Sequence, residues 1–523
     1  MRTRVSRLFS KVSPWILAIA IALFSALLYL RKTASFRFFD EENNIVAGYL
    51  MTQGRALYRD IFMNHNPLPL VISQLLQQAI PSGTHFDLVK LHRVFMVVFA
   101  LIANGLLLIR FRSKALLFVG AYEYMRFYIS GQMFLAEGMM AYMFAYYIFL
   151  LIEAYYDKRQ AISIRDTLIA SFLFAFIVLS REPYVPLVVV LYALVLIRSI
   201  SSKWAWGCAT ASFAAVGLFM LQYDLGEFYK QVVLLNGPHS VLESKTQGGL
   251  QIYSGIWQIL DYIRVGFSFD KPLYLILSPI CVLVLLFILH QLQSRRWSHS
   301  FFFLLTSILI LFLAGIRNFG SGTEWFGMYR SISYIAIITA FASSISSQKT
   351  KVALLIVIVF IALLHPRSHF IETRNNASEY YINYSPSYTT GTIIALLCEG
   401  QHDCNVFIDG IDVYPYFVSK IKPNYRFAFH YPVNRLFLDY SQVRTESLIS
   451  EKPIVYYDVS CMISPYKLPD VISQEYMWLN KIDQDGAFHE PSCIAIRKDR
   501  AGNVSSSARV EMRKHLYILP DNK

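Results

Sequence analysis

Apolar segments long enough to cross a membrane recur throughout the first 366 residues, and no other feature constrains the fold as strongly. A transmembrane helix needs roughly 20 mainly apolar residues, and about eleven such segments are present. They lie near residues 14–30, 88–109, 115–130, 133–152, 167–180, 184–198, 205–222, 273–292, 300–316, 331–347 and 352–366. The composition, 55% hydrophobic and only 16% charged, is too apolar for an ordinary soluble enzyme. We therefore predict a polytopic α-helical membrane protein.

Basic residues in the short loops predict the orientation, because Lys and Arg are concentrated in cytoplasmic loops. They precede the first apolar segment and then occupy every second loop: Arg2, Arg4, Arg7, Lys11, Arg110, Arg112, Lys114, Lys158, Arg159, Arg198, Lys203, Arg295, Arg296, Lys349 and Lys351. This alternation predicts a cytoplasmic N-terminus and an external location for everything after residue 367. The first segment lacks the small-residue cleavage site of a signal peptide, so we interpret it as a retained anchor.

The net charge of +13 agrees with this topology. Residues 367–523 contain 17 Lys and Arg and 18 Asp and Glu, so the excess of positive charge lies in the membrane part. Basic cytoplasmic loops and contact with anionic membrane lipids account for such an excess. Nothing in the charge pattern supports binding to nucleic acid.

Two domains are expected. Residues 1–366 form a transmembrane domain with external loops at 35–87 and 223–272, and residues 367–523 form a small extracytoplasmic α/β domain. Within the second domain, "NVFIDG", "KPIVYYDV" and "CIAIRK" favour short strands, and "TTGTIIALLCE" favours a helix. The polar residues 499–523 predict a weakly ordered end. Loop 223–272 is long and contains several glycines, which suits either a mobile lid or a plain connector.

The cysteines divide in the same way as the charges. Two of the six lie in apolar segments, and the other four, Cys398, Cys404, Cys461 and Cys493, lie in the external domain. An even number of cysteines in an oxidising compartment predicts disulfides. Of the three possible pairings we favour Cys398 with Cys404 and Cys461 with Cys493. The sequence contains no C-x-x-C motif or histidine cluster that would support zinc.

The first external loop carries an unusual density of polar residues. Asp40 and Glu41 follow the first apolar segment closely, where burial near the membrane surface would favour proton transfer by a carboxylate. Residues 40–51 have helical spacing, and the "TQG" that follows ends the helix. "ALYRDIF" predicts a second short helical element, which the prolines of "NHNPLP" end. Solvated helix ends and surface ion pairs are the ordinary alternative explanation for such acids.

The order of these residues resembles the first external loop of the GT-C superfamily of lipid-linked glycosyltransferases. The resemblance is strongest to bacterial relatives of the protein O-mannosyltransferases and of the aminoarabinose transferase. The matching residues are Asp40, Glu41, Ala47, Gly54, Tyr58, Asp60, Phe62, His65 and Pro67. The number of spans and the external C-terminal domain also resemble this family, so the resemblance covers most of the chain.

The resemblance implies inverting transfer of a sugar from a polyprenyl-phosphate-linked donor to a glycan, lipid or protein acceptor outside the membrane. Asp40 is the first candidate for the base that activates the acceptor hydroxyl, and Glu41 is the second. The leaving phosphate needs cations or hydrogen-bond donors, for which we propose Arg181, Arg330 and Tyr329. Further candidates are Arg317, Lys230 and His239. The alternative for each of them is a contact with a lipid headgroup or an ion pair, such as Arg181 with Glu182.

Glu137 stands near the outer end of a predicted span, where carboxylates are costly and commonly functional. In the family an acid of this region assists the catalytic aspartate, although relatives often have Asp where this chain has Glu. The cofactor is left open. One option is a divalent metal ion bridging Asp40, Asp60, His65 or Glu137, with Tyr58 also assigned to this first-loop substrate or metal site.

Other classes of membrane protein remain alternatives. A lipid or sugar transporter or flippase also has many spans and charges within the membrane, but it often shows repeated halves with broken helices. Another extracytoplasmic glycan polymerase or ligase typically has its arginines in a large central loop. A non-catalytic scaffold with this fold is the third alternative. The sugar, the acceptor, the length of the lipid carrier and the oligomeric state are not encoded in any motif.

Overall fold

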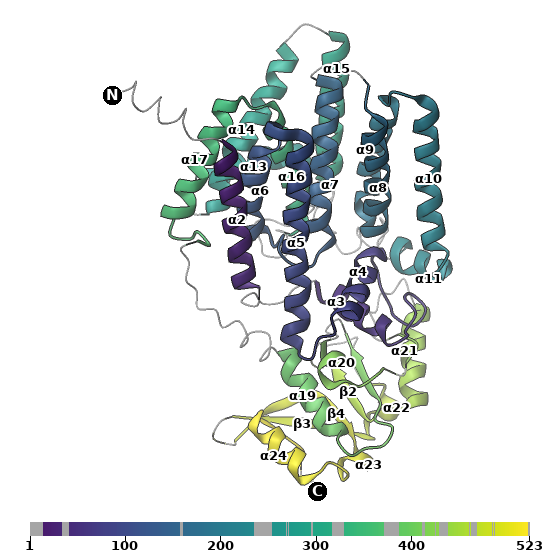
Figure 1. Cartoon of the computed structure of the whole chain (residues 1–523). Coiled ribbons are helices and arrows are strands. Elements are labelled where there is room, and N and C mark those ends of the chain that lie inside the picture. The colour runs from purple at the N-terminus through teal and green to yellow at the C-terminus, as the bar shows by residue number, and fades with distance from the viewer. Residues whose placement is uncertain are drawn as a thin grey trace. The chain divides into compact units, whose positions relative to one another are not determined.

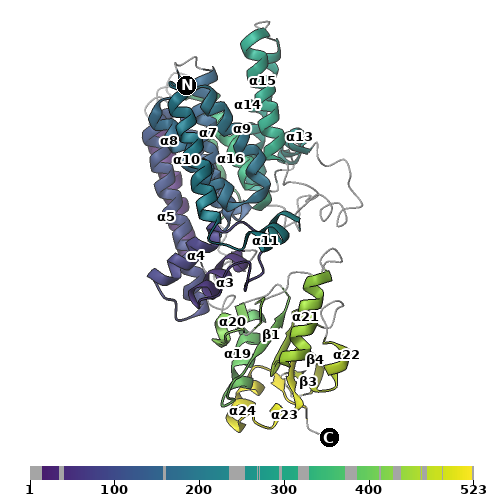
Figure 2. The same cartoon turned by 90° about the vertical axis from the view of Figure 1, so that its right-hand side faces the viewer.

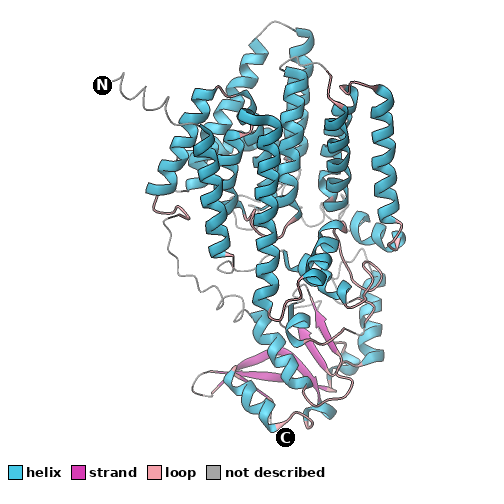
Figure 3. Ribbon diagram, viewed as in Figure 1, coloured by secondary structure: helices cyan, strands magenta, loops and turns pink. Residues whose placement is uncertain are grey.

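The computed structural model describes residues 14–33, 41–156, 161–234, 254–267, 269, 271–293, 297–315, 329–370, 386–410, 414–423, 425–427, 438–459, 461, 468–483, 485 and 487–520. Helices make up most of this part of the chain, and its strands all lie between residues 406 and 518 (Figure 3). The chain divides into two compact units, which we describe separately. Unit 1 comprises Met1–Thr33, His92–Leu221 and Val241–Asn376, and unit 2 comprises Ala34–Leu91, Gln222–Ser240 and Ala377–Lys523.

Unit 1 is a bundle of helices, shown in purple, blue, teal and green in Figure 1. Its helices are α2 (Pro14–Lys32), α5 (His85–Phe111, of which the first residues belong to unit 2), α6 (Leu116–Arg126), α7 (Ala136–Leu151), α8 (Ile164–Ser180), α9 (Val185–Ile197), α10 (Ser202–Met220), α13 (Ser254–Gly266), α14 (Pro272–Gln293), α15 (Trp297–Ala314), α16 (Ile332–Ile345) and α17 (Gln348–Leu364). Short helical turns η1 (Arg112–Lys114), η2 (Phe127–Ile129), η3 (Ile152–Tyr156), η4 (Glu182–Tyr184) and η8 (Tyr329–Ser331) connect or extend them. Each predicted apolar segment therefore forms a helix.

Serine residues begin three of these helices. The side chains of Ser163, Ser201 and Ser347 accept hydrogen bonds from backbone N–H groups in the first turns of α8, α10 and α17. Such a cap satisfies one of the backbone donors that a helix start leaves without a partner. The polar residues between the apolar segments therefore fix where these helices begin.

Four helical stretches in the described part of the chain are long and apolar enough to cross a membrane: Pro14–Lys32, His85–Lys114, Ala136–Tyr156 and Pro272–His290. A bent pair, Ser202–Met220 with Leu225–Leu234, would make a fifth. Shorter apolar helices occur at Glu182–Ile197, Leu305–Ala314, Ile332–Ile345 and Ser387–Cys398. These helices are those of an integral membrane protein, while the count of about eleven crossings and the orientation remain predictions.

Helix α7 forms the centre of unit 1. All 16 of its residues are buried, and its neighbours include α16, α8 and α9. A helix that is apolar on every side is stable only where other helices or lipid surround it. Helix α6 packs against α2 and α16 (Figure 1). The polar side chains at the start of α7 are therefore held inside the bundle.

A buried histidine follows the last helix of unit 1. His369 stacks against Phe127 and Phe370, with ring centroids 4.3 and 4.6 Å away, and its Nδ1 lies 3.0 Å from the hydroxyl of Tyr128. Lys32 donates a hydrogen bond of 3.1 Å to its backbone carbonyl. Burial, with a smaller contribution from the charge of Lys32, lowers the pKa of His369 to about 3. The imidazole is therefore neutral at physiological pH.

Unit 2 combines the first-loop segment with the C-terminal domain. Its elements are α3 (Glu41–Thr52), α4 (Leu68–Ala79), α11 (Leu225–Phe228), η5 (Tyr229–Leu234), α19 (Pro386–Cys398), β1 (Val406–Asp409), α20 (Tyr414–Ser419), α21 (Leu438–Glu451), β2 (Val455–Asp458), α22 (Asp470–Ser473), β3 (Tyr476–Ile482), β4 (Phe488–Arg497), α23 (Lys498–Ala501), α24 (Ser506–Lys514) and β5 (Tyr517–Ile518). The described residues of the first loop and of segment 222–234 are grouped with the C-terminal domain, and the division of the chain at residue 366 stays a prediction.

The sheet of unit 2 has five strands in the order β1-β2-β4-β3-β5. Strands β1 and β2 run parallel, and β4 pairs antiparallel with both β2 and β3. In Figure 2, α19, α20 and α24 lie to one side of the sheet and α21 and α22 to the other. Both β1 and β2 are buried along their whole length, and in the sequence each is a short apolar run that ends in an aspartate. The predicted α/β domain therefore has a central, two-sided sheet.

A buried ion pair stabilises the carboxyl end of β1. Asp409 is fully buried, and the Nε atom of Arg444 lies 2.9 Å from both of its carboxylate oxygens. The hydroxyl of Tyr456 donates a further bond of 2.6 Å to Asp409. Burial lowers the pKa of Arg444, but its hydrogen bonds and the charge of Asp409 outweigh burial and raise that pKa overall. This arrangement ties α21 to the two parallel strands.

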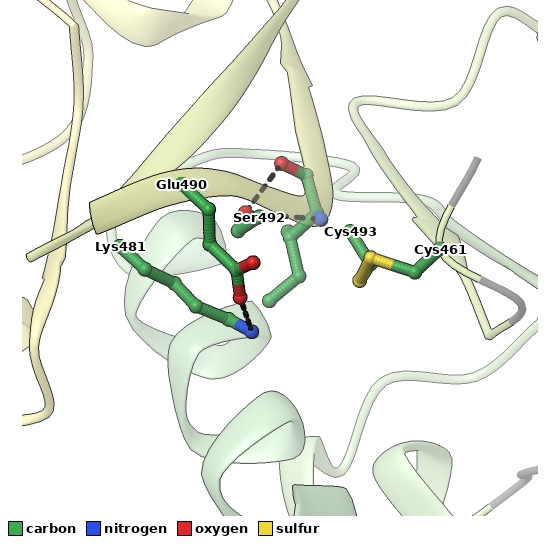
Figure 4. Close-up of a disulfide and its surroundings, with 6 residues drawn as sticks. Cys461, Lys481, Glu490, Ser492 and Cys493 are labelled. Carbon is green, nitrogen blue, oxygen red and sulfur yellow. Dashed lines mark hydrogen bonds and ion pairs between the residues drawn. A yellow bond between two sulfur atoms is a disulfide. The ribbon is translucent and has the colours of Figure 1, made fainter. Parts of the chain in front are cut away.

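Two disulfides close loops of the C-terminal domain, with the pairing favoured from the sequence. Cys398 pairs with Cys404, and Cys461 pairs with Cys493. Figure 4 shows the second disulfide beside β4, where Ser492 hydrogen-bonds the backbone of Ile494. The remaining cysteines of the chain are buried free thiols in unit 1.

Two local predictions are wrong. The C-terminal stretch contains α23, α24 and β5 rather than a weakly ordered end, because Ser505 caps α24 and Ala508 and Met512 bury one face of it. Residues 56–62 form a tight turn instead of a second helix. The second helix is α4, which begins just after Pro67, because a proline fits the first turn of a helix without loss of a hydrogen bond.

Candidate functional site

The acids at the start of the first loop lead directly into a helix. Asp40, the first candidate base, lies outside the described residues. Glu41, the second candidate, is the first residue of α3 and is fully buried. The N-terminus of a helix carries a partial positive charge that favours a carboxylate. Gly54, with φ at +86°, follows the end of α3, which agrees with the predicted helix and its "TQG" end.

A strained turn follows α3. Tyr58 is fully buried and has a φ of +66°, a left-handed conformation that costs free energy for any residue other than glycine. Its hydroxyl donates a hydrogen bond of 2.8 Å to the backbone carbonyl of His65, and its ring contacts the rings of Tyr223 and Phe228 edge-on. Tyr58 therefore holds the turn closed through the backbone of His65, and the role of these two residues toward a substrate or metal stays a prediction.

Asp60 contributes its carboxylate to the same turn. Its Oδ2 accepts a hydrogen bond of 2.9 Å from the backbone N–H of Ala56, and Arg59 lies 3.1 Å from its Oδ1. Burial raises the pKa of Asp60, but the bonds from Arg59 and Ala56 outweigh it and lower that pKa below the usual value. The contacts of Asp60 are thus those of a turn-stabilising residue, and its role toward a substrate or metal remains a prediction.

A clasp that the sequence did not reveal joins this turn to the C-terminal domain. Gln231 is fully buried and bridges two backbone groups of the first loop: its Nε2 donates to the carbonyl of Tyr58 at 2.7 Å, and its Oε1 accepts from the N–H of Met63 at 2.9 Å. Glu227 accepts hydrogen bonds from Gln231 at 3.1 Å and from Arg426 at 3.0 Å.

Tyr440 donates a further bond of 2.8 Å to Glu227, so that three separate segments of the chain meet at one carboxylate. We call Glu227 and Gln231 the clasp. An acid or amide followed four residues later by another polar residue is common on helices, so no sequence signal distinguished this pair. The clasp fixes the position of the first-loop turn within unit 2.

In unit 1, the structure brings Glu137 and Arg181 together. Glu137 is the second residue of α7, and Arg181 follows the last residue of α8. The Nε atom of Arg181 lies 3.3 Å from Oε1 of Glu137, and the two side chains are 7% and 2% exposed. Arg181 is therefore paired with Glu137, whereas the ion pair considered from the sequence was with Glu182. A nearly dry ion pair at the ends of two helices is costly unless it has a structural or functional role.

Arg330 lies close to the same helix ends through its backbone. The backbone N–H of Tyr184, a fully buried residue that the sequence did not single out, donates a hydrogen bond of 3.3 Å to the carbonyl of Arg181. The hydroxyl of Tyr184 in turn lies 3.4 Å from the carbonyl of Arg330. The segments of two proposed phosphate-binding arginines therefore meet at Tyr184. The side chain of Tyr329 lies outside the described part of the chain.

Sequence reasoning also missed a second buried ion pair in unit 1. Glu123 and Arg126, near the end of α6, are 3% and 0% exposed, and their charged groups lie 3.3 Å apart. Both residues fall inside a segment predicted as a span, and their charge was the available signal.

The described residues do not form a metal site. Among them, no group of three or more His, Cys, Asp or Glu side chains is close enough to hold a metal ion. Asp60 is occupied within its own turn, and Glu137 is paired with Arg181. The divalent metal considered from the sequence stays a prediction, since Asp40, one of its candidate ligands, lies outside the described residues, and we derive no chemical step from one.

Comparisons with known proteins give one similar solved structure. The chain is similar to the crystal structure of ArnT from Cupriavidus metallidurans bound to undecaprenyl phosphate, with a TM-score of 0.43 and 11% sequence identity. The similarity covers 93% of this chain and 98% of that chain. At this level of similarity, neither a shared site nor a shared activity follows. No protein-family model and no curated protein matches the chain.

Proposed function

We propose that this protein is a membrane glycosyltransferase. It transfers a sugar from a polyprenyl-phosphate-linked donor to a glycan, lipid or protein acceptor at the outer face of the membrane, with inversion at the anomeric carbon. The observation that carries the proposal is the buried pair of Arg181 and Glu137 at the ends of α8 and α7. The order of acidic, aromatic and proline residues in the first loop supports the same activity.

Arg181 has the chemistry that a leaving lipid phosphate requires. A guanidinium presents five N–H donors in a planar fork, and the Nε atom of Arg181 lies 3.3 Å from the carboxylate of Glu137. In surroundings with so little water, a hydrogen bond from an arginine to a phosphate oxygen is stronger than the same bond in solution. Glu137 keeps the guanidinium in place before the donor binds. Tyr184 links the backbone of this arginine to that of Arg330, which is proposed to contribute the second cation.

The acceptor side of the reaction is assigned to the acids of the first loop. Asp40 removes the proton from the acceptor hydroxyl as the oxygen attacks the anomeric carbon, and the bond from that carbon to the phosphate oxygen breaks. Attack from the opposite face inverts the configuration. Glu41, the buried residue that follows it in the sequence, is the alternative base. General-base catalysis of this kind contributes typically about 10² to 10⁴ in rate.

Binding of polyprenyl phosphate, the expected product, tests the phosphate site separately from catalysis. The double variant Glu137→Gln/Arg181→Gln removes the arginine without leaving a buried unpaired carboxylate. A charged hydrogen bond is worth about 1.5–3 kcal/mol, so the affinity should fall by roughly ten- to a hundredfold.

Arg264→Gln is the matched control, because Arg264 is 79% exposed and pairs with Asp261 on the surface of α13. It removes the same charge and should change the affinity by less than about twofold, since exposed pairs contribute little. Equal losses in both variants, or no loss in the double variant, would refute the assignment of Arg181.

A further inference from the structure

A network of buried hydrogen bonds connects α5, α6 and α7 inside unit 1. We call Asn104, Glu123, Arg126 and Tyr142 the Arg126 cluster; all four side chains are buried. Arg126 donates from Nη1 to the hydroxyl of Tyr142 at 2.7 Å and lies 3.3 Å from Glu123. Glu123 also accepts a bond from Asn104 at 2.8 Å and one from the hydroxyl of Tyr142. Tyr142 on α7 is therefore held by an acid and an arginine of α6 at once.

Arg126 makes further contacts that fix its own position. Its Nη2 donates to the backbone carbonyl of Met96 on α5 at 3.3 Å, and its guanidinium lies over the ring of Tyr29 on α2, 5.1 Å from the centroid. One residue thus contacts three other helices. Charged groups inside a membrane protein are expensive, and a lost partner leaves a buried charge unpaired. Because burying these charges costs free energy, we expect the cluster to have a role, and its contacts show that it holds neighbouring helices in place.

The connection between α6 and α7 is packed directly against this arginine. The N–H of Gly131 donates to the carbonyl of Arg126 at 2.9 Å, and a side chain at Gly131 would overlap the Cγ atom of Arg126. A side chain at Gly138, which follows Glu137, would come within 2.9 Å of the carbonyl oxygen of Gly131. Ser130 has a φ of +58°, a left-handed conformation with which the chain reverses direction between α6 and α7. No space separates Arg126, this connection and the first turn of α7.

We propose that the Arg126 cluster is a positioning device for Glu137. It holds α7 from two sides: through the hydroxyl of Tyr142, five residues after Glu137, and through Gly131 against Gly138. Together these contacts fix the position of the first turn of α7 along the helix axis and its rotation about that axis. They thereby fix the position of the Glu137 carboxylate, which pairs with Arg181. The importance of this position for turnover rests on the proposed function, whereas the positioning itself does not.

Amide hydrogen exchange on the full-length protein in detergent tests the positioning without any substrate. Tyr142→Phe removes only the hydroxyl that Glu123 and Arg126 share. Loss of one charge-assisted hydrogen bond should make local opening about tenfold more frequent, so peptides covering residues 131–140 should exchange about tenfold faster. Arg126→Lys should have the same effect, because lysine cannot reach Tyr142 and the carbonyl of Met96 together.

Tyr192→Phe is the matched control. The hydroxyl of Tyr192 is also buried, lies 2.7 Å from Ser171 between α9 and α8, and makes no bond to α6 or α7 in the described part of unit 1. It should leave exchange at residues 131–140 unchanged. Unchanged exchange in Tyr142→Phe, or an equal increase over the whole of unit 1, would overturn the positioning role.

A double-mutant cycle tests the connection to Glu137 once a donor is turned over. Tyr142→Phe should lower kcat about tenfold with little change in KM, and this loss should vanish in a Glu137→Gln background, because residues that act through one group are not additive. A loss that persists undiminished in that background would contradict the proposal. If no donor is turned over by the unaltered protein, the proposed function fails, and hydrogen exchange alone decides the positioning.

Discussion

Breaking the pair of Glu137 and Arg181 should destabilise unit 1 far more than breaking an exposed pair. Two unit charges 3.3 Å apart interact by about 5 kcal/mol at an effective dielectric constant of 20. Removal of one partner from a buried pair typically costs about 3–5 kcal/mol, because the remaining charge stays buried. We therefore expect losses of this size for Glu137→Gln and for Arg181→Gln, and a loss for the double variant that is well below their sum.

Unfolding of the full-length protein in mixed micelles of increasing SDS content measures these free energies. The control cycle uses Asp261 and Arg264, whose charged atoms are only 2.6 Å apart but whose side chains are 47% and 79% exposed. Its coupling energy should be about 0.2–1 kcal/mol, as for other exposed pairs. If the buried pair shows a coupling energy no larger than this, burial does not strengthen it, and the electrostatic argument for Arg181 fails.

Three further outcomes are expected. Glu227→Gln should accelerate protease cleavage within residues 56–63 severalfold, because the clasp loses the charge that Arg426 contacts at 3.0 Å; unchanged cleavage would show that the clasp does not hold the turn. Asp409→Asn should destabilise the C-terminal domain by about 3 kcal/mol or more, whereas Asp499→Asn, at an exposed pair, should cost less than about 1 kcal/mol in the same denaturation experiment. His369 should make the protein less stable in acid: its folded pKa of about 3 lies below the unfolded value, so stability should fall with decreasing pH from about 6.5 toward 3. His369→Phe should flatten that part of the pH profile, and an equally steep profile would contradict the assignment.

The elements with strong local patterns were predictable. Long apolar runs identified the helices of unit 1 except α13, which lies within the predicted loop 223–272, and buried β-rich runs identified β1, β2 and part of β4. Strand β3 was missed, since "YMWLNKI" alternates weakly and its place in the sheet depends on pairing with β4. The cysteines allowed three pairings, and the structure confirms the favoured one.

The candidate site was predictable only as separate residues. Arg181 and Glu137 were each proposed, but their pairing depends on how α7 and α8 pack. The clasp joins residues 58–63 to residues 227–231, and no local pattern carries information about so distant a contact. Glu123 lies in a segment that was predicted to span the membrane from its overall hydropathy. A residue-by-residue search of that segment would have identified this buried charge.

Sugar transfer is the central claim, and turnover of polyprenyl-phosphate-linked sugars by the purified protein tests it most directly. The experiment compares the unaltered protein with Asp40→Asn and, as a matched control among the neighbouring acids, Glu42→Gln. We predict that one donor is consumed, that polyprenyl phosphate appears in step with transferred sugar, and that only Asp40→Asn slows the reaction, by about 10² or more. Consumption of no donor by a folded protein, or equal rates with and without Asp40, would contradict the account and favour a transporter or scaffold.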